Sequence, residues 1–218
     1  MLKRLKAQHP DFTVLSPREK SFELFGRYLT DEAWKKLAGQ TRKLISADDV
    51  PSYLPSCREL ENGGMPERLL TGIFGDEEVQ IGVCRGFNDR LNGMEWHDCP
   101  EVVAACTPMV LVLGRVEDIR NNQWSSHQAV FCLLEEGDAV VLHKDTLHFA
   151  PCRVGEDPFL SVILLPRGVN ADILTTGGTD PQLWKERKWL MTHADSPQRK
   201  AGAPPGIIGK NIRVEPMI

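Results

Sequence analysis

The stretch NGMEWHDCPE at residues 92–101, with EGDAVVLHKDTLHFAP at residues 136–151, decides the fold and the chemistry expected of this chain. In an extended strand, successive side chains alternate between two faces, so Glu95 and His97 point to the same side. Glutamate and histidine are both common metal ligands. The first stretch therefore predicts a strand that presents two ligands to one interior point.

Two further residues complete the predicted site. Pro100 bends the chain, so that Glu101 can return to the same point from the start of the next strand. His148 comes from the second stretch. Together with Glu95 and His97 they offer two imidazoles and two carboxylates, a donor set that suits Mn(II), Fe(II), Zn(II) or Ni(II) better than Ca(II). We expect one divalent transition metal per chain, with these four residues as its ligands.

Short apolar runs separated by turns surround the two stretches, a spacing typical of a β-sandwich or β-barrel. We therefore expect an all-β single domain over residues 1–218, with an N-terminal extension at 1–65, a barrel core at 69–168 and a C-terminal helix and tail at 169–218. The runs are LLTGIF (69–74), VQIGVC (79–84), VVAAC (102–106), MVLVLG (109–114), AVFCLL (129–134), AVVLH (139–143) and LSVILL (160–165).

Outside the barrel core, local signals predict a few further elements. Short helices are expected at the start of the chain and over residues 30–39, where Thr30 can cap and Gly39 can stop the helix. FELFGRYL at residues 22–29 indicates a strand between them. Asp180-Pro181 is typical of a helix start, so QLWKERKWLMTH at 182–193 is expected to be helical, with Lys188 as an ordinary helix residue, and a last strand is expected at 207–214.

The composition and charge limit which partners the protein is expected to bind and where in the cell it is expected to work. The net charge is -4 and the 26 basic residues are scattered, so no nucleic-acid partner is expected. The N-terminus lacks the apolar segment of a secretory signal, and the longest apolar run, at 129–134, is far too short to span a membrane. The six cysteines form no C-x-x-C pair. We therefore expect a cytoplasmic protein whose reduced cysteines pack as small apolar residues.

The spacing of these residues resembles the cupin superfamily. In the first cupin motif, two histidines one residue apart are followed by a glutamate; Glu95-x-His97-x-x-x-Glu101 keeps that spacing, with Glu95 in place of the first histidine. Gly137 and His148 stand at the ends of the second motif. The resemblance implies a jelly-roll barrel, a bound metal and a tendency to pair as a homodimer.

Longer segments are similar to a family of bacterial cupins described as a domain of unknown function. FELFGRYL also resembles, over these few residues, the N-terminal strand of ureidoglycolate lyases, which share the cupin fold. The segments similar to the bacterial family are FELFGRYL (22–29), NGMEWHDCPE (92–101), TLHFAPC (146–152), LLPRGVN (164–170) and KWLMTH (188–193).

Four residues are candidates for a catalytic or substrate-binding role beside the metal. Glu95 is an alternative catalytic base if it does not bind the metal. His143, which stands where the second cupin motif has a turn-forming proline, is either an acid or base in the pocket or a turn residue at the barrel rim. Arg85 and His127 are candidates for binding substrate, Arg85 because a guanidinium can anchor a carboxylate or phosphate.

The cupin fold hosts many reactions, so the site has to decide among them. A metal with few open positions suits a chelated α-hydroxycarbonyl compound, which favours an isomerase, epimerase or lyase that acts on a small sugar, sugar acid or hydroxy acid through an enediolate. An Fe(II) dioxygenase is the second hypothesis. A sugar- or effector-binding module without catalysis is the third.

Overall fold

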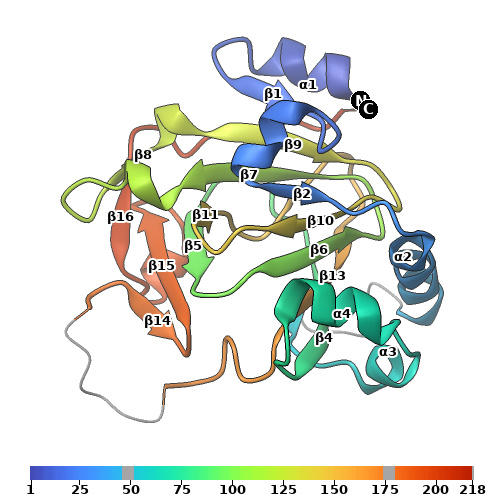
Figure 1. The fold of residues 1–218 in the computed structure, drawn as a ribbon. Coiled ribbons are helices and arrows are strands. Elements are labelled where there is room, and N and C mark those ends of the chain that lie inside the picture. Colours follow the sequence, from blue (N-terminus) through green and yellow to red (C-terminus); the bar gives the residue numbers. More distant parts are fainter. Residues whose placement is uncertain (46–51, 174–179, 218) are drawn as a thin grey trace.

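Two β-sheets face each other across an apolar interior in the computed structural model, which describes residues 1–45, 52–173 and 180–217 (Figure 1). One sheet has six strands in the order β2 (Gly26–Tyr28), β10 (Ala139–Leu142), β6 (Glu101–Ala105), β13 (Phe159–Pro166), β4 (Val79–Gly86) and β3 (Tyr53–Leu54). The facing sheet has the order β1 (Thr13–Leu15), β9 (Val130–Leu134), β7 (Met109–Arg115) and β11 (Thr146–Leu147), with β12 (Cys152–Arg153) also paired to β7.

A third sheet closes one end of the barrel. Its order is β14 (Leu183–Lys185), β15 (Lys188–His193), β16 (Pro205–Ile208) and β8 (Trp124–Ser125), and β5 (Gly93–His97) pairs with the other edge of β15. A bridge between Glu95 and His148 joins β5 to the end of β11. Residues from both motif stretches therefore meet at this end.

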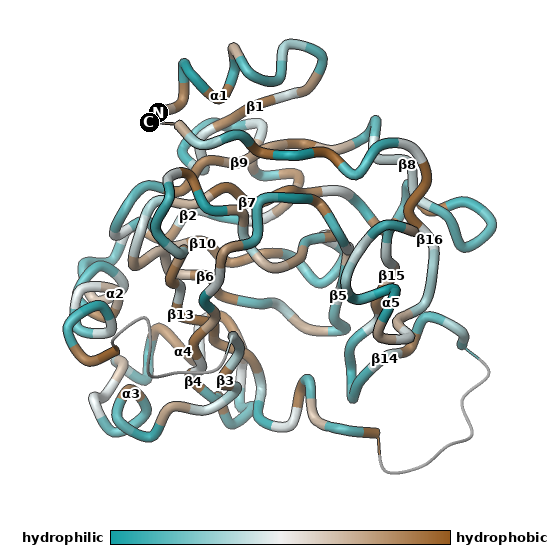
Figure 2. The backbone as a smooth tube through the Cα atoms, turned by 180° about the vertical axis from the view of Figure 1, so that it is seen from behind, coloured by the Kyte–Doolittle hydropathy of each residue, from teal (hydrophilic) through white to brown (hydrophobic). Residues whose placement is uncertain are grey.

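Apolar runs form the central strands because both faces of the six-stranded sheet are buried. On β6, Val103 and Ala105 face the barrel interior, whereas Val102 and Ala104 face an outer layer of helices. That layer consists of α2 (Glu32–Leu44), α3 (Arg58–Asn62) and α4 (Glu67–Phe74), and Trp34 of α2 is 2% exposed within it. In Figure 2 the central strands run largely through hydrophobic colour.

The remaining helices are short. The 3-10 turns are η1 (Lys20–Leu24), η2 (Val116–Asp118) and η3 (Ser126–Gln128), and the other α-helices are α1 (Leu2–Gln8) and α5 (Pro197–Lys200). Leu5 of α1 packs against the outer side of the facing sheet. Among the described residues no helix is long and apolar enough to cross a membrane. The all-β fold class and the helix at the start of the chain are confirmed.

The helix expected over residues 182–193 is wrong, and this correction changes the site. The segment forms the β14–β15 hairpin, in which Leu183 pairs with Trp189 and Lys185 with Lys188. Strand β15 then pairs along all of β5. Arg187 makes the turn with a φ of 57°, a left-handed conformation that usually favours glycine or asparagine, so no turn signal marked the hairpin.

Other local expectations also need correction. Residues 69–74, expected as a strand, lie in α4, because burying Phe74 in the outer layer needs only one helical face. FELFGRYL divides into η1 and the short strand β2. Helix α2 is capped by Asp31, whose side chain accepts from the Ala33 amide, and it runs past Gly39 to Leu44. The last strand covers Pro205–Ile208 rather than 207–214.

Candidate metal centre

Three buried side chains converge at the end of the barrel where the motif stretches meet. His97 ends β5, Glu101 begins β6, and His148 follows β11; each is at most 5% exposed. Glu101 Oε2 lies 3.4 Å from His97 Nδ1 and 3.2 Å from His148 Nε2. One potential ligand atom from each residue fits within 4.8 Å of the other two. The cluster could hold a metal ion.

Neighbouring groups orient the two imidazole rings. His148 Nδ1 lies 2.9 Å from the Thr146 carbonyl oxygen, which can only accept, so this nitrogen carries the proton. His97 Nε2 lies 3.1 Å from Asn170 Oδ1, while the Asn170 amide nitrogen donates to the Tyr53 hydroxyl. His97 Nε2 is therefore the donor as well. In each neutral ring the remaining nitrogen presents its lone pair to Glu101.

Two lone pairs and a carboxylate oxygen that face one another repel unless a positive charge lies among them. His97 Nδ1 is buried and has no hydrogen-bond partner among the described residues. A divalent cation satisfies all three atoms at once, so the residues fit the metal that the sequence predicts. Carboxylate and imidazole hydrogen bonds to outer residues are typical of metal ligands.

Without a metal, protons must relieve this repulsion. Burial opposes a charge on His148, but the adjacent Glu101 carboxylate outweighs it and raises the pKa of His148 to about 9. Burial also resists ionisation of Glu101, yet His148 prevails and lowers the pKa of that carboxyl. At His97 burial dominates and lowers the pKa. The metal-free cluster therefore favours a His148–Glu101 ion pair beside a neutral His97.

Glu95 lies outside this three-residue cluster. Its backbone pairs with that of His148: the Glu95 amide donates to the His148 carbonyl at 2.6 Å, and the His148 amide donates to the Glu95 carbonyl at 3.0 Å. Its carboxylate forms an ion pair with Lys188, and both side chains are largely buried, at 12% and 16% exposed. The structure thus pairs Glu95 with the Lys188 ammonium instead of placing it among the three clustered metal-binding residues.

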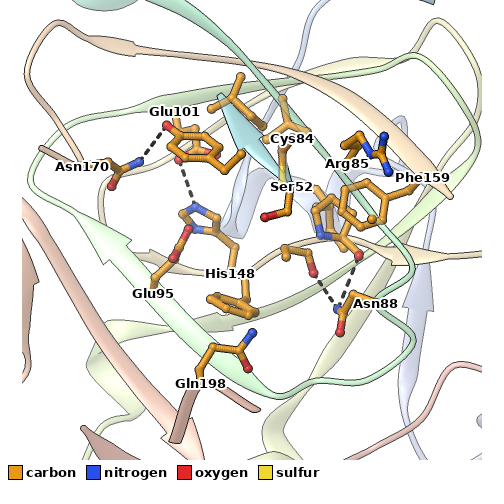
Figure 3. Close-up of a pocket in the computed structure, with 18 of the residues that line it drawn as sticks. Ser52, Cys84, Arg85, Asn88, Glu95, Glu101, His148, Phe159, Asn170 and Gln198 are labelled. Atoms are coloured by element: carbon orange, nitrogen blue, oxygen red, sulfur yellow. Dashed lines mark hydrogen bonds and ion pairs between the residues drawn. The ribbon is translucent and has the colours of Figure 1, made fainter. Parts of the chain in front are cut away.

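A cavity of about 390 Å³ opens beside the cluster (Figure 3). Glu95, Glu101, His148 and Lys188 line it, and its walls also hold apolar side chains such as Phe149. The other lining residues are Ser52, Tyr53, Cys84, Arg85, Gly86, Phe87, Asn88, Val103, Leu111, Ala150, Pro151, Phe159, Ile163, Asn170 and Gln198. A small molecule in this space would touch both the metal ligands and the Glu95–Lys188 pair.

The other predicted site residues lie farther from the cluster. Arg85 lines the cavity, but its guanidinium points away from Glu101 and His148 in Figure 3. His143 is in an exposed turn at the barrel rim, with Nε2 at 3.2 Å from the Glu23 carbonyl. His127 is exposed in η3, and neither histidine lines the cavity. The turn interpretation therefore replaces the pocket interpretation of His143, and His127 is a surface residue.

Lys188 and Asn170 belong to the site, although the sequence did not indicate them as site residues. Lys188 pairs directly with His97 across β15 and β5, so both side chains lie on the same face of the ribbon. Reading KWLMTH with the period of a strand would have placed Lys188, Leu190 and Thr192 together on that face. No local signal marks Asn170, which reaches His97 only through the fold.

The facing sheets and the buried His-Glu-His cluster match what the resemblance to the cupins implies, a β-barrel with a metal-binding cluster at one end. The chain belongs to the family described as Domain of unknown function (DUF4867), which matches residues 14–212. The expectation that the chain belongs to a family described as a domain of unknown function is thereby confirmed. No curated protein matches the chain.

Three solved structures show weaker likeness. Oxalate decarboxylase from Bacillus subtilis, in a study of its Mn(II) centres, is 10% identical, with a TM-score of 0.31 over 41% of this chain and 22% of that one. A structure reported with the DMSP lyases RdDddP and RnDddQII is 18% identical, with a TM-score of 0.30 over 45% and 44%. The non-heme α-ketoglutarate-dependent epimerase SnoN from nogalamycin biosynthesis is 16% identical, with a TM-score of 0.39 over 81% and 91%. This chain spans about a fifth of the oxalate decarboxylase.

Proposed function

We propose that this protein is a metal-dependent isomerase, epimerase or lyase that moves a proton at a carbon next to a carbonyl group. One observation carries the proposal: the Glu95 carboxylate lies outside the His97–Glu101–His148 cluster but lines the same cavity. A metal-binding cluster and a separate carboxylate are the two parts that such a reaction needs. The metal, when bound, would polarise the carbonyl and so make the neighbouring C–H more acidic.

Glu95 is suited to act as the base in this reaction. It is only 12% exposed, so little water competes for its oxygens, and the Lys188 ammonium holds its carboxylate in place. Its backbone is tied to that of His148, so the base and a ligand keep a fixed separation. In Figure 3 the Glu95 carboxylate lies beside the His148 ring.

The cavity supports a small substrate. A volume of about 390 Å³ is near the lower end of the usual range for ligand sites, and apolar residues such as Leu111 and Phe159 alternate in its walls with polar groups that can bond to a ligand. Three protein ligands leave up to three positions on an octahedral metal. Two adjacent oxygens of a hydroxycarbonyl compound can occupy two of them.

One observation favours a second candidate, the Fe(II) dioxygenase. With Glu95 paired to Lys188, the cluster is reduced to two histidines and one carboxylate, the ligand set of many non-heme Fe(II) oxygenases. This shell leaves room for both O₂ and substrate. The two functions differ in their need for oxygen, which makes them separable by experiment.

The test is hydrogen exchange in D₂O without oxygen. Protein loaded with Mn(II), Fe(II), Zn(II) or Ni(II) is incubated with small ketoses, aldoses, sugar acids and hydroxy acids, and deuterium is followed by NMR and mass spectrometry. We expect deuterium at one C–H position of the right compound, and loss of exchange in Glu95→Gln. His143→Gln is the matched control and should keep the activity.

Three results would contradict the proposal or the role of Glu95 in it. Turnover that occurs only with O₂ and consumes it stoichiometrically would favour the dioxygenase. Saturable binding of a panel compound without any exchange or conversion would favour the binding module. Exchange that persists unchanged in Glu95→Gln would show that another group is the base.

A further inference from the structure

We infer that Lys188 anchors a carboxylate group of the substrate, so that the site takes a small hydroxy acid or sugar acid rather than a neutral sugar. This inference rests on the proposed function and narrows its substrate class. Lys188 reaches the cavity because β15 pairs with β5 and places it directly opposite His97. It is the one lysine among the described residues that line the cavity.

The charges in the cavity favour an anionic ligand. At the end of the cavity beside the cluster, away from the Arg85 guanidinium, a divalent metal and the Lys188 ammonium bring three positive charges, against two negative charges on Glu95 and Glu101. One positive charge is left over in a largely buried space, and a buried net charge is costly. A substrate with one carboxylate neutralises it, whereas a neutral sugar does not.

Lys188 has the capacity for this second partner. An ammonium group offers three hydrogen-bond donors, and the only contact shown for Lys188 Nζ among the described residues is its ion pair with Glu95. A substrate carboxylate on the same nitrogen would lie beside the base, which is where a reacting carbon has to be placed. The Arg85 guanidinium points away from the cluster in Figure 3, so Lys188 is the better placed cation.

Gln198 supplies a neutral hydrogen-bonding group in the same cavity. It comes from α5, and its Oε1 atom is buried with no hydrogen-bond partner among the described residues. As a residue that lines the cavity, Gln198 can bond to a hydroxyl group of a ligand through the part of its amide that the cavity exposes. A molecule with both a carboxylate and hydroxyl groups satisfies Lys188 and Gln198 together.

The experiment is calorimetric titration of Mn(II)-loaded protein with glycerate and xylonate, each compared with its neutral counterpart, glyceraldehyde or xylose. We expect at least one acid to bind about tenfold or more tightly than its neutral counterpart. Because Lys188→Met alone leaves Glu95 buried without a partner, the comparison is between Glu95→Gln and the double variant Glu95→Gln/Lys188→Met. Removing Lys188 from the Glu95→Gln background should weaken acid binding about 10- to 100-fold and leave the neutral compounds unchanged.

Lys185→Met is the matched control, because Lys185 lies on the same hairpin but pairs with the exposed Asp172. It should leave acid binding unchanged. If the folded, metal-loaded protein binds neither acid, or binds both members of a pair equally, the inference is overturned. Equal acid affinity in Glu95→Gln with and without Lys188→Met overturns it as well. Acid binding that depends on Lys188 without deuterium exchange would refute only the proposed function.

Discussion

Removing the metal should make the stability of this protein fall as pH rises from neutral to alkaline. In the metal-free cluster, His148 and Glu101 form an ion pair with their nearest atoms 3.2 Å apart, and Glu101 raises the pKa of His148 from 6.5 to about 9 against the effect of burial. A histidine whose pKa is raised by folding binds its proton more tightly in the folded state. Its contribution is therefore complete below pH 6.5 and is lost as pH rises through 9.

The magnitude follows from the two pKa values. Each pKa unit corresponds to about 1.4 kcal/mol, so His148 contributes roughly 3 kcal/mol to the free energy of unfolding below pH 6.5, and roughly 2 kcal/mol of it is lost between pH 6.5 and 8.5. For a chain of this length, that loss lowers the melting temperature by about 4–8 °C. Unfolded cysteines also start to ionise near the upper end of this range, whereas burial raises the pKa of Cys84 to about 12, so the share due to His148 is obtained by comparison with a variant that lacks it.

The assay is urea unfolding of chelator-treated protein at constant ionic strength, at half-unit steps from pH 6.5 to 8.5. His148→Asn should make the fall in stability shallower by roughly 2 kcal/mol over this range, and His143→Asn, at the exposed rim, should leave it unchanged. Protein saturated with metal should show the opposite slope, since metal and protons compete for the same nitrogen. A metal-free protein whose stability is constant or rises over this range would refute the arrangement of His148 and Glu101 described above.

Three further outcomes are expected. Elemental analysis and metal titration should find about one divalent transition metal per chain. His97→Ala should weaken metal binding far more than His193→Ala, because the His193 ring bonds to the Gly209 carbonyl and lies outside the cluster. Equal metal affinities in the two variants would mean that the site lies elsewhere. Glu95→Gln should change metal affinity little, as judged by the same titration, because Glu95 is outside the cluster; a loss near that of His97→Ala would make it a ligand. Gly114→Ala should lower the free energy of unfolding by about 1–3 kcal/mol, because the Cβ of the alanine would lie 2.6 Å from the buried Trp124 ring. An unchanged midpoint of urea unfolding would contradict this packing.

Much of the barrel could be predicted from the sequence because its signals are local. VVAAC is apolar at every position and LSVILL at every position but Ser161, as expected for strands buried on both faces, and these runs lie largely in β6 and β13. Short apolar segments without that continuity were less informative. LLTGIF contains enough apolar residues for either a strand or one helical face, and packing against the outer side of the sheet selects the helix α4.

The sequence by itself determined which residues could bind a metal. The spacing of His97 and Glu101 about a proline, and the position of His148 after a β-run, are short-range features, because strand alternation and proline bends act over a few residues. Only the tertiary structure decided the partner of Glu95. Lys188 lies 93 positions along the chain from Glu95 in a segment whose pattern also fits a helix, and pairing of β15 with β5 turns it into the cavity. That pairing depends on hydrogen bonds between distant strands, which no local pattern records.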